Sequence, residues 1–168
     1  VMLGFFSCTH LPYKTPGEYA RLWTDPDYRG PHRNELQLNV DEFIGKTDIN
    51  EKWSHLPREE IEQVTALYDG CVRMFDDCVG RVVKVLEEEG LLQDTIILIT
   101  SDHGDDLFEP GVTFGHGLTF NGGDQSNHVP AVFYVPDVRK PGRAVPEVMR
   151  TLEFAPTLLE LAGMPLDP

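Results

Sequence analysis

The chain has 168 residues, 40% hydrophobic and 25% charged, which is the composition of a globular domain rather than of a disordered segment. Its 28 acidic and 14 basic side chains give a formal net charge of −14, which argues against nucleic acid or an anionic membrane as the main partner. No run approaches the roughly 18 consecutive apolar residues of a membrane-spanning helix, and the N-terminus lacks the pattern of a signal peptide. The localisation is therefore left open.

The first third of the chain is predicted to be one strand followed by a long loop. Val1 to Cys8 is a short apolar run that predicts a buried strand, so His10 would emerge at a strand end. Residues 14–56 are rich in Pro, Gly, Asp and Asn, with a short helix predicted at Glu18 to Trp23. This loop-rich excursion is expected to run over the surface and could cover a site. A loop of this length inside a compact domain is either functional or a sign that its elements are wrongly assigned.

A long helix is predicted from Pro57 to about Gly90. Pro in the first turn, with Glu59 and Glu60 against the helix dipole, is typical of a helix start. An apolar stripe at helical spacing indicates a face that packs on the core. Its members are Ile61, Val64, Tyr68, Cys71, Phe75, Cys78, Val82 and Leu86. Cys71 and Cys78 stand two turns apart, about 10.5 Å of rise and too far for a disulfide, so both are expected to be buried thiols.

Two strands and a helix are predicted in the remainder. Thr95 to Thr100 is a β-branched run of the kind found in central parallel strands. Val129 to Val135 is a further strand, with Pro130 at its start or at a sheet edge. Thr151 to Gly163 predicts a final helix. A helix that leads into a buried strand is half of a βαβ unit, so residues 1–168 are predicted to form one α/β domain.

The segment Ser101-Asp102-His103-Gly104-Asp105 follows the first of these strands directly. In open α/β sheets, ligands bind outside the carboxyl ends of the strands. A carboxylate and an imidazole held there can bind one divalent cation, and the pair suits calcium, manganese or zinc. The alternative is an Asp that caps the next turn with a His packed beside it. Asp102 and His103 are therefore predicted metal ligands.

Several motifs in the same order resemble the sulfatase family. They are Leu91-Leu92-Gln93-Asp94-Thr95, the Asp-His segment, Gly115-His116-Gly117, His128-Val129-Pro130 and the run from Ala155 to Gly163. The resemblance implies the α/β fold of the alkaline phosphatase superfamily, a central mixed, mostly parallel sheet flanked by helices. It also implies that Asp102 and His103 bind the catalytic cation, which is commonly calcium in sulfatases.

The resemblance assigns roles to further residues. His116 would bind the substrate anion or donate a proton, a task that suits an imidazole near neutrality, although a surface-loop His is the alternative. His10, in His-Leu-Pro-Tyr, is similar to a family His that faces the sulfuryl group or the leaving oxygen; the alternative is a packed core His. Independently of the resemblance, Lys14 could supply the local positive charge that an anionic ester needs on an acidic chain. Asp124 and His128 have the Asp-x-x-x-His spacing of zinc sites in the two-metal phosphatases of the same superfamily. In those enzymes the pair precedes the Asp-His segment, whereas here it follows the segment, so coincidence is favoured.

Two elements of the family pattern are absent, namely the Cys/Ser-x-Pro-x-Arg segment that yields formylglycine and an N-terminal Asp-Asp pair. The resemblance therefore implies the C-terminal part of a sulfatase catalytic domain, whose missing N-terminal half is its partner. The predicted function is that of a metal-dependent hydrolase of small-molecule or glycan sulfate esters, inactive as this chain alone. One alternative is a phosphonate or phosphodiester hydrolase, or a phosphoethanolamine or phosphoglycerol transferase, of the same superfamily. The other is a non-catalytic module or pseudoenzyme.

Overall fold

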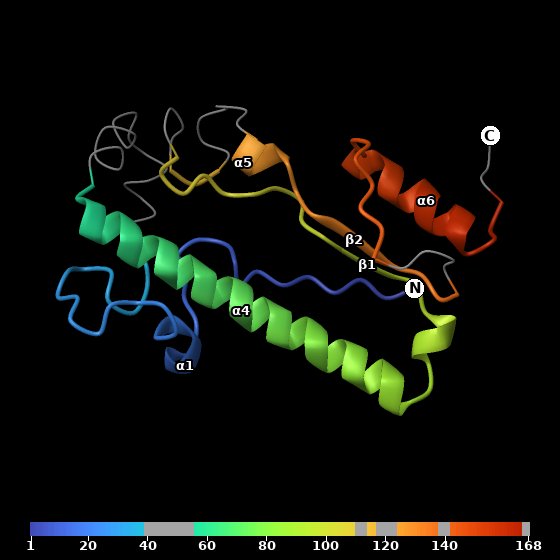
Figure 1. The fold of residues 1–168 in the computed structure, drawn as a ribbon, viewed down its shortest axis with the longest axis horizontal. Coiled ribbons are helices and arrows are strands. Elements are labelled where there is room, and N and C mark those ends of the chain that lie inside the picture. Colours follow the sequence, from blue (N-terminus) through green and yellow to red (C-terminus); the bar gives the residue numbers. More distant parts are fainter. Residues whose placement is uncertain (39–55, 110–113, 117–123, 138–141, 166–168) are drawn as a thin grey trace.

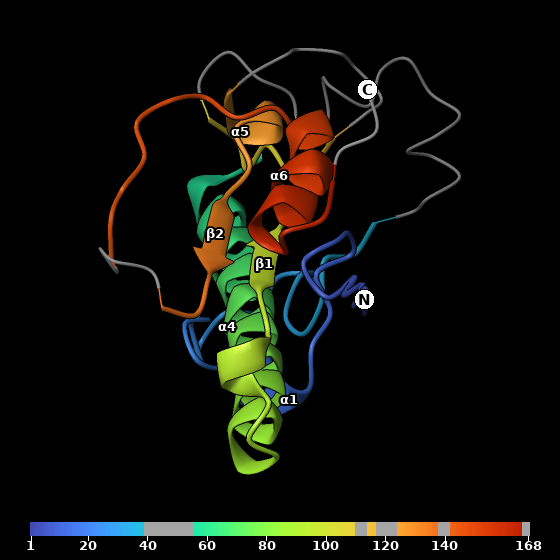
Figure 2. The same ribbon diagram turned by 90° about the vertical axis from the view of Figure 1, so that its right-hand side faces the viewer.

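A computed structural model of the protein describes residues 1–38, 56–109, 114–116, 124–137 and 142–165. Its longest element is a helix that runs the length of the molecule below a short sheet (Figure 1). In chain order the helices and strands are α1 (Gly17–Ala20), α4 (Arg58–Glu88), β1 (Ile97–Thr100), α5 (Asp124–Asn127), β2 (Ala131–Tyr134) and α6 (Phe154–Leu161). The 3₁₀ turns Leu92–Asp94 and Thr151–Glu153 precede β1 and α6. In both ribbon views the sheet lies between α4 and α6 (Figures 1 and 2).

The predicted long helix is confirmed almost to the residue. The carbonyl oxygen of Pro57 accepts hydrogen bonds from the N–H groups of Glu60 and Ile61 and so begins α4. At the other end Gly90 takes a positive φ of 68°. The N–H of Leu91 reaches back to Leu86, which completes a Schellman-type stop. Among the described residues, no helix is both long enough and apolar enough to cross a membrane.

Only the first half of α4 is packed into a core. The buried cluster contains Tyr13, Ala20, Leu36, Val64, Leu67, Cys71 and Phe114. All buried residues of α4 lie between Gln63 and Cys71. The stripe is therefore confirmed as core-facing at Val64 and Cys71. The expectation of a second buried thiol is wrong, because Cys78 is only half-buried; all three cysteines are free.

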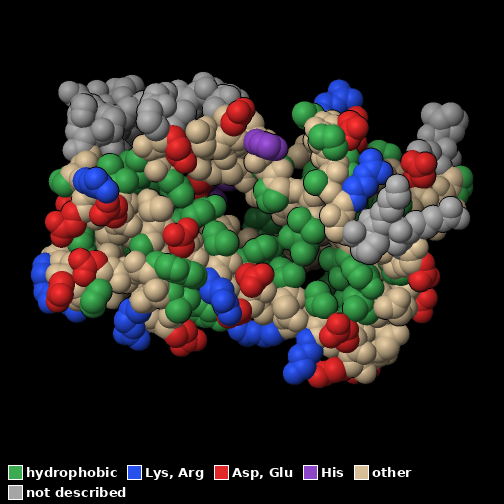
Figure 3. Space-filling model, in the orientation of Figure 1, with side chains coloured by type: hydrophobic (Ala, Val, Ile, Leu, Met, Phe, Trp, Pro, Cys, Tyr) green, Lys and Arg blue, Asp and Glu red, His purple; other side chains and the backbone are tan. Residues whose placement is uncertain are grey.

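The predicted strand at residues 1–8 is wrong. The segment is extended and largely exposed, and no ladder pairs it with a strand within the described ranges. In the view of Figure 1 it is seen alongside α4, and hydrophobic side chains show on that part of the surface in Figure 3. The ring of Phe6 packs edge-on against Phe75 of α4, with centroids 5.6 Å apart. A strand requires hydrogen-bonding neighbours on its edges, and an apolar sequence without them stays an extended coil.

Both strands of the described sheet were predicted, but their direction differs from the expected one. β1 and β2 pair antiparallel, with Ile97 opposite Tyr134 and Thr100 opposite Ala131. Two antiparallel strands do not confirm a mostly parallel sheet. β1 is half-buried rather than fully buried. α6 lies beside the sheet, where Phe154 contacts Phe133 of β2 at a centroid distance of 6.4 Å.

The loop-rich excursion of residues 14–56 is described as far as residue 38. The short helix predicted at Glu18 to Trp23 begins and ends earlier, at Gly17–Ala20. Residues 39–55 lie outside the described residues. Near the C-terminus the expected helix is confirmed as the 3₁₀ turn followed by α6, with Gly163 in a positive-φ conformation just beyond it.

Candidate active site

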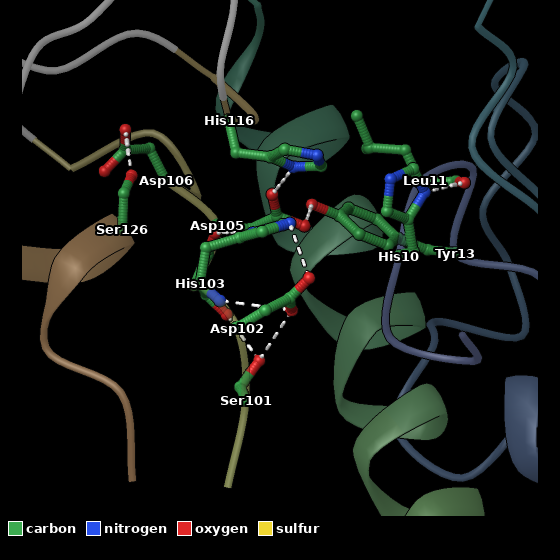
Figure 4. Close-up of polar contacts among 11 residues, drawn as sticks. His10, Leu11, Tyr13, Ser101, Asp102, His103, Asp105, Asp106, His116 and Ser126 are labelled. Atoms are coloured by element: carbon green, nitrogen blue, oxygen red, sulfur yellow. Dashed lines mark hydrogen bonds and ion pairs between the residues drawn. The ribbon is translucent and has the colours of Figure 1, made fainter. Parts of the chain in front are cut away.

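The Asp-His segment follows β1 in a tight turn (Figure 4). The hydroxyl of Ser101 donates a hydrogen bond to the carbonyl oxygen of His103 at 2.5 Å. The N–H of His103 donates to Oδ1 of Asp102 at 3.1 Å. The other carboxylate oxygen, Oδ2, lies 3.8 Å from Nε2 of His103. The structure thus brings together one oxygen and one ring nitrogen of the predicted metal pair, while Asp102 also caps the turn.

A buried carboxylate lies behind this turn. Asp105 is only 5% exposed at its side chain, and its two oxygens have different partners. Oδ2 accepts a hydrogen bond from the hydroxyl of Tyr13 at 2.9 Å, and Oδ1 contacts Nδ1 of His116. Burial, and then the charge of Asp105, raises the pKa of Tyr13 above its ordinary value, so its hydroxyl remains a donor.

Three predicted histidines lie next to one another in this region, and His116 is the one that contacts the carboxylate (Figure 4). The ring centroids of His103 and His116 are 4.0 Å apart. The ring of His10 lies edge-on to that of His116 at 4.8 Å and to that of His103 at 6.4 Å. The three residues come from separate segments of the chain, and only the tertiary structure makes them neighbours. His10, His103 and His116 therefore form what we call the histidine cluster.

In each of the three rings, Nδ1 is the nitrogen that is hydrogen-bonded to the protein. Nδ1 of His10 lies 2.8 Å from the carbonyl oxygen of Leu11, and Nδ1 of His103 lies 2.9 Å from that of Gly104. Nδ1 of His116 contacts the Asp105 carboxylate. Carbonyl and carboxylate oxygens only accept hydrogen bonds, so each Nδ1 must carry the proton. Each neutral ring then presents Nε2 as a lone pair for a metal, and each protonated ring presents Nε2–H to an anion.

Backbone contacts fix the two turns of the cluster against each other. Asp106 and Gly115 exchange N–H to carbonyl hydrogen bonds of 3.1 and 2.9 Å. The N–H of Gly104 donates to the carbonyl oxygen of Ser126 in α5 at 2.8 Å. A Cβ on Gly104 would lie 2.0 Å from the carbonyl oxygen of Gln125, so only glycine allows this approach. These contacts fix the positions of His103 and His116 relative to each other.

Asp106 lies beside the cluster, and its side chain points towards Ser126 of α5. Its side chain accepts a hydrogen bond from the hydroxyl of Ser126 at 2.9 Å, and the residue is 3% exposed. Burial raises the pKa of Asp106 above its ordinary value. Two adjacent carboxyl groups thus have different partners: Asp105 faces the histidines, and Asp106 ties the turn to α5.

Lys14 has another partner in this structure. Its Nζ forms an ion pair of 2.5 Å with Glu35, and this pair lowers the pKa of Glu35 below its ordinary value. The Lys14 side chain is exposed, so the pair is a weak restraint. A role for Lys14 in binding substrate stays a prediction.

Within the described part of the chain, one group of side chains has the geometry of a metal site. His103, Asp105 and His116 each offer a ligand atom, and these atoms all lie within 4.8 Å of one another. The group shares His103 with the predicted pair and adds two residues. Asp124 and His128 are exposed, and the bond between them joins backbone atoms only. Their zinc-like spacing therefore gains no support here.

Two functional candidates were missed in the sequence, namely Tyr13 and Asp105. Both lie inside the quoted motifs, Tyr13 in His-Leu-Pro-Tyr and Asp105 at the end of the Asp-His segment. No local pattern relates them, because they are 92 residues apart. The signal available in the sequence was that each of them is a polar residue within three positions of a motif histidine.

Comparison with known proteins places the chain in a family. The family model described as Sulfatase matches residues 4–164. The chain belongs to the sulfatase family. Membership implies an alkaline-phosphatase-like α/β fold, in agreement with the fold class expected from the motifs.

Three sulfatase relatives show the extent of the match. An arylsulfatase of Clostridium perfringens is 30% identical over 156 residues, which cover 91% of this chain and 32% of that protein. Human iduronate 2-sulfatase is 24% identical, covering 95% of this chain and 35% of the relative. Arylsulfatase K of Danio rerio is 35% identical over 111 residues, 66% of this chain and 20% of the relative. This sulfatase chain thus spans about a third of the length of the first two relatives.

Proposed function

We propose that the chain is part of a metal-dependent sulfuric ester hydrolase whose nucleophile lies outside these 168 residues. The observation that carries the proposal is the histidine cluster around a buried carboxylate at the carboxyl end of β1, in a chain of the sulfatase family. The relatives are named for sulfatase action on aryl and iduronate groups. By analogy, the substrate class is a small-molecule or glycan sulfate ester.

The donor set fits a divalent cation. Asp102 supplies a carboxylate, and His103 supplies an imidazole whose Nε2 is directed away from its backbone contact. Calcium, which the resemblance implies, prefers oxygen ligands, whereas imidazole nitrogens also suit manganese and zinc. When bound, the cation would polarise an ester oxygen and stabilise negative charge there. Asp102 and His103 would hold it.

His116 and His10 are the proposed proton donors and anion contacts. Their rings adjoin, and each has Nδ1 fixed on an oxygen acceptor, which leaves Nε2 for the substrate. When the ester O–S bond breaks, the sulfuryl group passes to the nucleophile outside these residues, and the leaving alkoxide takes the Nε2 proton of a protonated ring. The products of this step are the sulfated nucleophile, the alcohol and a neutral imidazole. Lys14 would add positive charge only if it left Glu35.

Metal binding is measured first. Isothermal calorimetry with calcium, manganese and zinc is carried out on the chain in chelator-free buffer. We expect weak binding that the Asp102→Ala/His103→Ala variant loses, because the chain supplies only part of the ligand shell. The matched control is Asp124→Ala/His128→Ala, which removes the same two residue types from an exposed pair. Binding unchanged by the first double variant would contradict the assignment.

Reaction type is measured on the full-length protein. Turnover of 4-nitrophenyl sulfate is compared with that of bis(4-nitrophenyl) phosphate, and we expect the sulfate ester to be preferred. Preference for the phosphodiester would favour the alternative within the superfamily. No turnover of either ester, with metal bound, would favour a non-catalytic module. The 168-residue chain alone is expected to be inactive, and sulfatase turnover by it would overturn the placement of the nucleophile.

A further inference from the structure

Asp105 has an enclosed side chain with a partner on each oxygen. Its side chain is 5% exposed, and both of its oxygens are occupied by donors from distant segments. Tyr13, itself fully buried, donates its hydroxyl hydrogen to Oδ2. His116 contacts Oδ1 through Nδ1. A carboxylate can accept a hydrogen bond from each of the two donors through a separate oxygen, whereas an amide of the same shape offers one acceptor and one donor.

We propose that Asp105, anchored by Tyr13, is the positioning residue of His116, and that it fixes the ring in the Nδ1–H tautomer with Nε2 free for the substrate. The assignment rests on the proposed function for the role of His116. Asp105 acts through the ring and does not touch the substrate.

The competing role for Asp105 is that of a metal ligand. Its oxygens and the nitrogens of His103 and His116 are close enough together for that role. However, Oδ1 and Nδ1 of His116 are engaged with each other, and Oδ2 is engaged with Tyr13. A cation bound by Asp105 would have to displace one of these hydrogen bonds. The observed contacts therefore favour positioning, with His116 able to contribute Nε2 alone.

The other two rings of the cluster do not depend on Asp105. His10 and His103 are held by backbone carbonyl oxygens, which no side-chain substitution removes. His116 alone in the cluster depends on a side chain for its tautomer. Figure 4 shows the Asp105 carboxylate between His116 and Tyr13, and the His10 ring lies beside that of His116. Loss of the carboxylate should therefore change one ring and leave two unchanged.

The test is nitrogen-15 NMR of the imidazole rings, recorded on the chain at a pH where they are neutral. Wild type is expected to show His10, His103 and His116 as Nδ1–H tautomers. In Asp105→Ala, His116 should change to a mixture rich in the Nε2–H tautomer, because Nδ1 has lost its acceptor. His10 and His103 should not change. Asp106→Asn is the matched control, since that adjacent carboxyl contacts Ser126 instead.

A second variant guards against misfolding. Asp105→Asn keeps the side-chain shape. The Tyr13 hydroxyl donates to its amide oxygen, so the amide nitrogen faces Nδ1 of His116, which must then accept. The same change of tautomer is expected. A His116 that keeps the Nδ1–H tautomer in both variants would overturn the proposal, as would a zinc-induced shift at Nδ1 rather than Nε2 in wild type.

Kinetics of the full-length protein separate this inference from the proposed function. In Asp105→Asn we expect kcat for a sulfate ester to fall by about 10²- to 10⁴-fold with KM little changed, as for loss of a tautomer-fixing carboxylate. A changed tautomer with unchanged kcat would leave the positioning intact and contradict the proton-donor role of His116. An unchanged tautomer with normal sulfatase turnover would contradict only the positioning.

Discussion

The two halves of α4 share one helix and one apolar stripe but differ in burial. From Arg58 to Cys71 the helix packs against α1 and the core residues Tyr13 and Leu36, and it carries every buried residue of α4. From residue 72 to Glu88 none is buried in the described structure, and Val72 and Val85 are exposed. An amphipathic pattern therefore specifies which face can be buried, while burial itself depends on what packs there.

The candidate site belongs to the packed half. Tyr13 contacts the ring of Tyr68 of α4 at a centroid distance of 5.2 Å and donates to Asp105 of the site. Phe114, two residues before His116, belongs to the same core cluster. The histidine cluster thus adjoins the buried core, which suits a site that needs fixed geometry.

Two helix glycines provide the sharpest contrast between the halves. A Cβ on Gly70 would lie 2.7 Å from the carbonyl oxygen of Tyr19 in α1, whereas a Cβ on Gly80 would meet nothing within 4 Å. We expect Gly70→Ala to destabilise by about 1–3 kcal/mol, because α1 must move. Gly80→Ala should stabilise by about 0.5–1 kcal/mol through helix propensity. Urea denaturation measures both, and stabilisation by Gly70→Ala would mean that α1 does not pack there.

Two valines test burial with the same chemical change. Val64 is 0% exposed and Val85 is 56% exposed. Val64→Ala is expected to cost about 2 kcal/mol for the buried methyl groups it removes. Val85→Ala should stay within about 0.5 kcal/mol of wild type. Equal losses in thermal or urea unfolding would show that the second half is also covered in solution.

Two cysteines give the smallest and most specific difference. Burial, and then the nearby Cys8, raises the pKa of Cys71 from its ordinary value of 9.0 to about 12. Above pH 9 the unfolded thiol loses its proton while the folded one keeps it, so stability falls as pH rises from 9 towards 12. The free energy of unfolding against pH should fall less steeply in Cys71→Ala.

Cys78→Ala is the control for this measurement. It removes the thiol of the half-buried position and leaves Cys71 in place. Its slope above pH 9 should match that of wild type. A shallower slope in Cys78→Ala than in Cys71→Ala would contradict the assignment.

Local sequence signals predicted the elements well. Pro57 and Gly90 mark the two ends of α4, and the β-branched run became β1. The Asp-His segment was placed correctly after the strand, since strand ends and turns depend on neighbours in sequence. Family motifs also identified His10 and His116, which the structure brings to His103.

Tertiary structure alone decided the rest. The sequence did not determine that β1 pairs antiparallel with β2, or that only half of the helix stripe is buried. It also did not determine that residues 1–8 form no ladder with the other described residues. Nor did it indicate that Tyr13 would meet Asp105 across 92 residues. Helix and strand propensity are set by near neighbours, whereas strand direction, burial and the partners of a buried carboxylate are set by which distant segments pack together.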